Sequence, residues 1–71
     1  MRSRAYTAAL QQRRRFSLLR ADEIESYLEV HTLLDKATRD LILNSLRLNR
    51  LLADSLNTRI QQLQRRYYAQ H

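Results

Sequence analysis

Glycine, proline and cysteine are all absent from this sequence of 71 residues. The lack of cysteine excludes disulfides and thiolate metal sites, and it gives no information on the redox compartment. Tight turns that need a positive φ lack their usual residue when glycine is missing. A chain this short buries only about 60% of its unfolded surface, and small scaffolds commonly gain stability from a disulfide, a metal or a partner. We therefore expect a helical protein partner or a homo-oligomer.

The composition is typical of an all-α protein. Leucine, arginine, glutamine and alanine are abundant, and all four are good helix formers. Hydrophobic residues make up 44% of the chain and recur at helical spacing, so the chain can bury a stripe that a disordered chain lacks. No apolar run approaches the ~18 residues that span a membrane. The sequence predicts one small helical domain over residues 1–71.

Apolar periodicity predicts two to three helices, at about 4–19, 22–34 and 40–69. Asp22 and Glu25 have the spacing of a capping box, which favours a new helix at that point. The polar residues 35–40 are the best candidate for a connection between helices, although the apolar spacing also allows one continuous rod. The expected architecture is a basic N-terminal helix or arm (1–20) and a helical hairpin (21–71) with a long C-terminal helix.

The last predicted helix carries a heptad pattern. Residues 41–53 are apolar nearly all round, which is typical of a buried helix. A helix of about 30 residues is roughly 45 Å long, and a middle helix of ~13 residues covers less than half of it. We expect a second copy or a helical partner to cover the rest. The predicted protein interface consists of Ile42, Leu46, Asn49, Ala53, Leu56, Ile60, Leu63 and Tyr67.

Asn49 interrupts this apolar pattern. A buried amide that needs a partner amide sets the register and the oligomeric state of a coiled coil. Alternatively, Asn49 lies at the edge of the pattern and stays hydrated. Both interpretations fit the sequence.

The charges are strongly segregated. Residues 1–20 contain six arginines and no acid, residues 21–40 contain six acids and two bases, and residues 41–71 contain five arginines and one acid. The two basic ends repel each other, so we expect them to stay apart unless an anion lies between them. We expect the basic arm to dock on the acidic segment 22–40, either its own or that of a copy.

Nucleic acid is the alternative partner. Arginine forms bidentate contacts with phosphate, and neighbouring aromatic rings stack on bases. Arg13–Arg15 span most of a helix circumference, so at least one guanidinium must lie close to the apolar face. The same arginines are equally explained by pairing with the acidic segment. The possible nucleic-acid contacts are Arg13, Arg14, Arg15, Arg65, Arg66, Tyr67 and Tyr68.

No residue pattern indicates catalysis, a cofactor or a metal. His31 and Asp35 are spaced as two ligands on one helix face, but no third ligand accompanies them. Hydroxyl groups lack a defined base and an orienting group. A membrane-surface helix at residues 1–20 is less favoured, because the apolar face around Phe16 is short and interrupted. We expect a protein that is not an enzyme.

The expected function is that of a small non-enzymatic protein–protein interaction module, with a nucleic-acid-binding regulator as the alternative. In size and composition the chain is similar to short helical regulators, adaptors and secretion-type co-chaperones, although no motif connects it to them. We expect a cytoplasmic, intracellular location. A mitochondrial location stays open, because the arginine-rich, acid-free residues 1–20 have the composition of a presequence.

Overall fold

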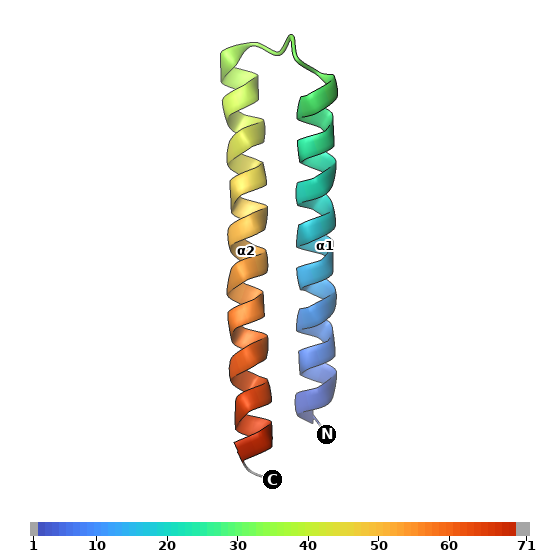
Figure 1. The fold of residues 1–71 in the computed structure, drawn as a ribbon, viewed down its shortest axis with the longest axis vertical. Coiled ribbons are helices and arrows are strands. Elements are labelled where there is room, and N and C mark those ends of the chain that lie inside the picture. The colour runs from blue at the N-terminus through green and yellow to red at the C-terminus, as the bar shows by residue number, and fades with distance from the viewer. Residues whose placement is uncertain (1, 70–71) are drawn as a thin grey trace.

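The chain forms an antiparallel helical hairpin in a computed structural model that describes residues 2–69, with the side chains of residues 4–66 (Figure 1). Helix α1 runs from Arg2 to Val30 and helix α2 from Lys36 to Ala69. The hairpin measures 55 × 14 × 14 Å. The described residues contain no strand. The predicted all-α hairpin with a long C-terminal helix is therefore confirmed.

Helix α1 is continuous over 29 residues, so the prediction of separate helices at 4–19 and 22–34 is wrong. Asp22 and Glu25 lie within α1 and are exposed. A capping spacing starts a helix only where the preceding chain leaves the helical conformation. The residues around Asp22 are good helix formers with no glycine or proline among them, and nothing interrupts the helix there.

The connection lies at residues 31–35 and not at 35–40 as predicted. Asp35 is the N-cap of α2, since its Oδ2 accepts a hydrogen bond from the backbone N–H of Thr38 at 3.2 Å. Hydrogen bonds from Thr38, first from its side chain and then from its backbone, lower the pKa of Asp35. This cap starts α2 within the polar segment that the sequence suggested as the loop.

The C-terminal end of α1 is capped by a histidine. The His31 ring is stacked on the Tyr27 ring, with centroids 3.9 Å apart, and its Nδ1 donates to the Tyr27 carbonyl at 3.0 Å. The backbone N–H of His31 donates to the same carbonyl at 2.9 Å. No described residue has a positive φ. The helix thus ends without the left-handed residue that is common at this position, and the His31 side chain adds a second donor to one of its last carbonyls.

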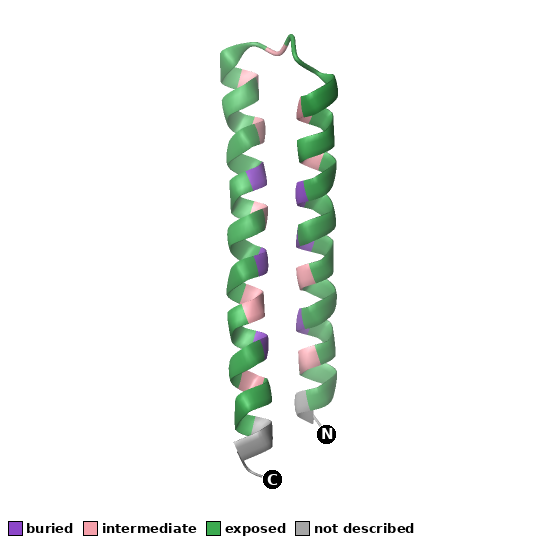
Figure 2. Cartoon of the chain, in the orientation of Figure 1, coloured by how far each residue is buried: buried purple, intermediate pink, exposed green. Residues whose placement is uncertain are grey.

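A seam of buried and half-buried residues joins the helices, and the buried bands of each helix face the other (Figure 2). Counted away from the turn, the seam positions advance by four and three residues alternately on both helices. This common heptad spacing brings seam positions equally far from the turn to the same level, as in an antiparallel coiled coil. On α1 they are Leu28, Ile24, Ala21, Ser17, Arg14, Leu10 and Thr7, and on α2 they are Ile42, Leu46, Asn49, Ala53, Leu56, Ile60 and Leu63.

The middle of the seam contains small residues. Ser17, Ala21 and Ala53 are among the most buried side chains, and no large described side chain is fully buried. Small residues let two helices approach closely, but they bury little apolar area. The single hairpin therefore has a thin core.

Candidate interaction surface

The predicted interface on α2 faces α1 within the same chain. Three of its residues are buried and four are half-buried, whereas the side chain of Tyr67 lies outside the described residues. The expectation that α1 leaves most of this face uncovered is wrong, because α1 is twice as long as predicted and its seam extends to Thr7. As an interface with a partner chain, the same positions stay a prediction. The buried members are Leu46, Ala53 and Ile60, and the half-buried members are Ile42, Asn49, Leu56 and Leu63.

Asn49 lies in the seam, and its amide bonds within its own helix. The Nδ2 atom donates to the Ser45 carbonyl at 2.8 Å. Thr58 makes a similar bond to the carbonyl four residues earlier, with its Oγ1 donating to Asp54 at 3.1 Å. One N–H of the Asn49 amide is thus satisfied within its own helix, without a partner amide.

One flank of the seam is charged. Glu25 and Arg50 immediately follow the seam positions Ile24 and Asn49, and they form an ion pair between the helices. This pair shows that residues following those seam positions lie on the same side of the hairpin. Leu18 and Leu43 occupy equivalent places on this charged flank.

The opposite flank carries large apolar side chains. Leu52 immediately precedes the seam position Ala53, Tyr27 precedes Leu28, and further residues lie one turn away on the same side. These side chains are between two-fifths and three-quarters exposed, so the hairpin does not cover them. We call this surface the apolar flank. It consists of Phe16, Tyr27, Leu41, Leu48 and Leu52.

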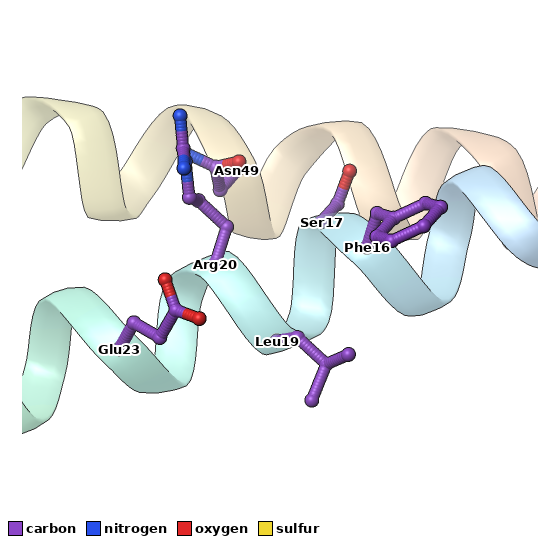
Figure 3. Close-up of a pocket in the computed structure, with 6 residues that line it drawn as sticks. All are labelled: Phe16, Ser17, Leu19, Arg20, Glu23 and Asn49. Carbon is purple, nitrogen blue, oxygen red and sulfur yellow. The ribbon is translucent and has the colours of Figure 1, made fainter.

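A groove of about 340 Å³ opens at the α1 side of the apolar flank. Phe16, Arg20 and Glu23 line it together with Asn49. Arg20 extends towards α2 beside Asn49, whereas Leu19 points away from α2 (Figure 3). The groove is an open depression between side chains, unlike the enclosed clefts that bury most of the surface of a small ligand.

The apolar flank was missed at the level of sequence. Residues 41–53 were interpreted as one helix buried all round, but Leu41, Leu48, Leu51 and Leu52 are exposed in the hairpin. The interpretation is wrong for the single chain, because one neighbouring helix covers only one face. Leu41, Leu48 and Leu52 follow each other by seven and four residues, and this second heptad spacing was the available signal.

The open end of the hairpin, away from the turn, is basic. The fold places residues 2–20 of α1 alongside the C-terminal half of α2, so the two basic ends lie side by side, an arrangement that the sequence predicted only with an anion between them (Figure 1). Arg13, Arg15, Arg65 and Arg66 are exposed, but Arg14 is half-buried in the seam. Arg14 is therefore the guanidinium that lies close to the apolar face. The side chains of Tyr67 and Tyr68 lie outside the described residues.

The acidic residues of α1 lie nearer the turn, in the same straight helix as the basic residues. The basic arm therefore cannot fold back onto the acids of its own helix, and that expectation is wrong. Within the part of the chain whose side chains are described, Glu25 has an ionic partner, whereas Asp22, Glu23 and Glu29 are exposed without one. Docking of the arm on the acidic segment of a copy stays a prediction.

The described residues contain no cluster that could form a metal site, because no three His, Cys, Asp or Glu side chains gather closely enough to hold an ion. His31 and Asp35 instead cap the two helix ends that meet at the turn. Neither described helix combines the length and the apolar character needed to span a bilayer.

Comparison with known proteins gave no relative: no family model, no curated protein and no solved structure matches the chain.

Proposed function

We propose that this protein is a non-enzymatic helical interaction module that assembles with another helical surface through its apolar flank. The observation that supports this function is the gathering of five large exposed side chains on one side of a hairpin with a thin core. Soluble monomers rarely expose contiguous apolar patches of this kind unless a partner covers them. An adaptor or regulator is the type of protein that such a surface suits.

The apolar flank is a better docking surface than the seam. A partner that used the seam would first have to displace α1, whereas the apolar flank is accessible in the folded hairpin. Leu41, Leu48 and Leu52 present a second heptad stripe, which is the pattern that packs against another helix. Assembly would bury the apolar area that the hairpin leaves in water, at about 25 cal/mol for each Å².

Substitutions on the two flanks test this function. Leu48 on the apolar flank is 55% exposed and Leu43 on the charged flank is 45% exposed, so they form a matched pair on one helix. Leu48→Glu should raise the dissociation constant of the assembly at least tenfold, as measured by sedimentation equilibrium. Leu43→Glu should change it little, and both variants should stay helical by circular dichroism. If Leu48→Glu associates as tightly as the wild type, the proposal is wrong.

A second candidate function is binding of nucleic acid at the open end. The supporting observation is that the hairpin brings the arginines of α1 up to Arg15 to the same end as Arg59, Arg65 and Arg66, and none of the described ones has an ionic partner. Backbone phosphates would relieve the repulsion between these groups. Binding of a labelled duplex should then fall by orders of magnitude between about 50 and 200 mM salt. A lack of binding at the lower salt concentration would eliminate this candidate.

A further inference from the structure

We infer that the apolar flank binds a second copy of this chain, packed antiparallel to the first. The two hairpins form a four-helix bundle in which the turn of each copy lies beside the open end of the other. This inference rests on the proposed function and adds the identity and the direction of the partner. It follows from the distribution of unpaired charge along the hairpin and from the position of the apolar side chains.

The charge distribution sets the direction. The half of the hairpin nearer the turn, residues 17–53, carries five bases and six acids and has a net charge of −1. The other half, residues 1–16 and 54–71, carries eight bases and one acid and has a net charge of +7. Parallel packing places +7 beside +7, which is unfavourable because these charges lie within about a Debye length of each other. Antiparallel packing places each basic half beside the acidic segment of the other copy.

Both charge groups are available for this contact. Within the described part of the chain, three of the four acids between Asp22 and Glu29 have no ionic partner. The exposed arginines Arg13, Arg15 and Arg59 have none either. Within a single hairpin Glu23 and Arg13 lie ten residues apart on α1, about 15 Å along the helix, so they cannot pair with each other. An antiparallel copy packed on the apolar flank brings together the charges of that flank, Glu23 and Arg13, whereas Asp22, Glu29 and Arg15 lie on the charged flank.

The apolar side chains lie near the middle of the hairpin, where a twofold axis between two antiparallel copies would pass. Phe16 lies at the middle of α1, and Leu52 lies at the middle of α2. A twofold axis through this level brings each of these side chains close to its own mate in the other copy, as an isologous interface requires. Leu48 and Leu41 extend the contact towards the turn.

The same axis brings specific charges together at the edge of the apolar contact. Glu23 lies on this flank, in the groove beside Phe16, about two turns from the axis on the turn side. Arg13 precedes the seam position Arg14 and so lies on the same flank, on the other side of the axis. Glu23 of each copy therefore lies within reach of Arg13 of the other.

The available area is sufficient for a dimer. A long face of 55 × 14 Å offers roughly 800 Å². Stable complexes of standard size bury about that much on each partner. The helices would then surround a second apolar layer, the arrangement of a four-helix bundle.

Single cysteines test the direction, because the native chain contains none. Ser55→Cys introduces a thiol on the apolar flank near the axis, and Leu33→Cys introduces one at the tip of the turn, where the native side chain is 99% exposed. With a flexible bifunctional thiol crosslinker the full-length Ser55→Cys protein should form a covalent dimer, because the two thiols lie only three residues on either side of the axis. Leu33→Cys should remain uncrosslinked at the same concentration, because its mate lies at the far end of the bundle. Efficient crosslinking of Leu33→Cys would show parallel packing and overturn the inference.

Charge reversal tests the contact itself. Glu23→Arg and Glu29→Arg change the net charge equally, but Glu23 lies on the apolar flank and Glu29 does not. Glu23→Arg should weaken the dimer about tenfold in sedimentation equilibrium, and Glu29→Arg should weaken it by less than threefold. Combining Glu23→Arg with Arg13→Glu in one chain should restore most of the affinity. Equal effects of the two single variants, or no recovery in the combined one, would contradict the contact.

The failure of this inference is distinguishable from failure of the proposed function. If the wild type sediments as an 8.5 kDa monomer at micromolar concentration, the inference is wrong. If the wild type is a dimer and Leu48→Glu does not weaken it, the apolar flank is not the interface, and both the inference and the proposed function fail. If Leu48→Glu weakens the dimer but Leu33→Cys crosslinks, only the direction is wrong.

Discussion

Arg50 donates a hydrogen bond from Nη2 to Oε2 of Glu25, and this ion pair connects α2 to α1 on the charged flank. The two side chains are 53% and 49% exposed, so water and salt screen their attraction. The pair comes from residues 25 positions apart in the sequence. The pair therefore forms only in the correct register of the hairpin. Because it is exposed, it indicates which register is present but contributes little to the stability of the fold.

A double-mutant cycle on this pair should give a small coupling energy. We expect Glu25→Gln and Arg50→Gln to couple by about 0.5 kcal/mol, because exposed ion pairs contribute 0.2–1 kcal/mol. Urea unfolding followed by circular dichroism gives the four free energies, and the coupling should shrink in high salt. A coupling close to zero in low salt would show that the two side chains do not meet in solution.

The seam makes a larger contribution to stability than any exposed leucine. Leu46 is buried between the helices, whereas Leu51 on the same helix is 54% exposed and faces away from α1. Leu46→Ala should lower the free energy of unfolding by about 2–4 kcal/mol, since it leaves a gap in the core. Leu51→Ala should lower it by no more than about 0.5 kcal/mol. Chemical denaturation at one protein concentration compares them, and equal losses would mean that the assigned seam is wrong.

Asp35 gives the turn a pH dependence. Its pKa is lowered by the hydrogen bonds from Thr38, so its stabilising effect is complete above the pKa of the unfolded carboxyl group and is lost as the pH falls through the lowered value. Asp35→Asn keeps a good N-cap without the charge, and Asp35→Ala removes the cap. At neutral pH the midpoint temperature of thermal unfolding should be highest for the wild type, lower for Asp35→Asn and lowest for Asp35→Ala. The advantage of the wild type over Asp35→Asn should disappear in acid, and an advantage that persists unchanged there would contradict the role of the charge.

The helical class and the phase of α2 were predictable because both follow from local spacing. The 3,4 repeat from Leu46 to Leu63 marks the residues that face α1, and it needs no knowledge of the rest of the fold. The helix ends were less predictable, because His31 and Asp35 cap their helices through side-chain contacts whose sequence signals are weak. The apolar flank depends on which face α1 leaves uncovered. The spacing of Leu41, Leu48 and Leu52 marks a stripe in the sequence, but only the formed hairpin shows that α1 leaves this stripe in water.

Arg14 is the seam residue whose replacement should stabilise the protein. It is half-buried at the level of Leu56, with Leu10 one turn away, so a charged group occupies a position that the heptad spacing reserves for an apolar one. Arg14→Leu replaces this half-buried charged side chain with an apolar one that packs across the seam.

We expect Arg14→Leu to raise the free energy of unfolding by about 1 kcal/mol, measured by urea denaturation. Arg15→Leu is the matched control, because it removes the same charge from an exposed position in the next residue and should leave stability within about 0.5 kcal/mol. If both variants are stabilised equally, the increase in unfolding free energy comes from relief of repulsion among the arginines at the open end. If neither gains, the aliphatic part of Arg14 already packs in the seam as well as leucine would. A gain confined to Arg14→Leu would show that this arginine is held in the seam at a cost in stability.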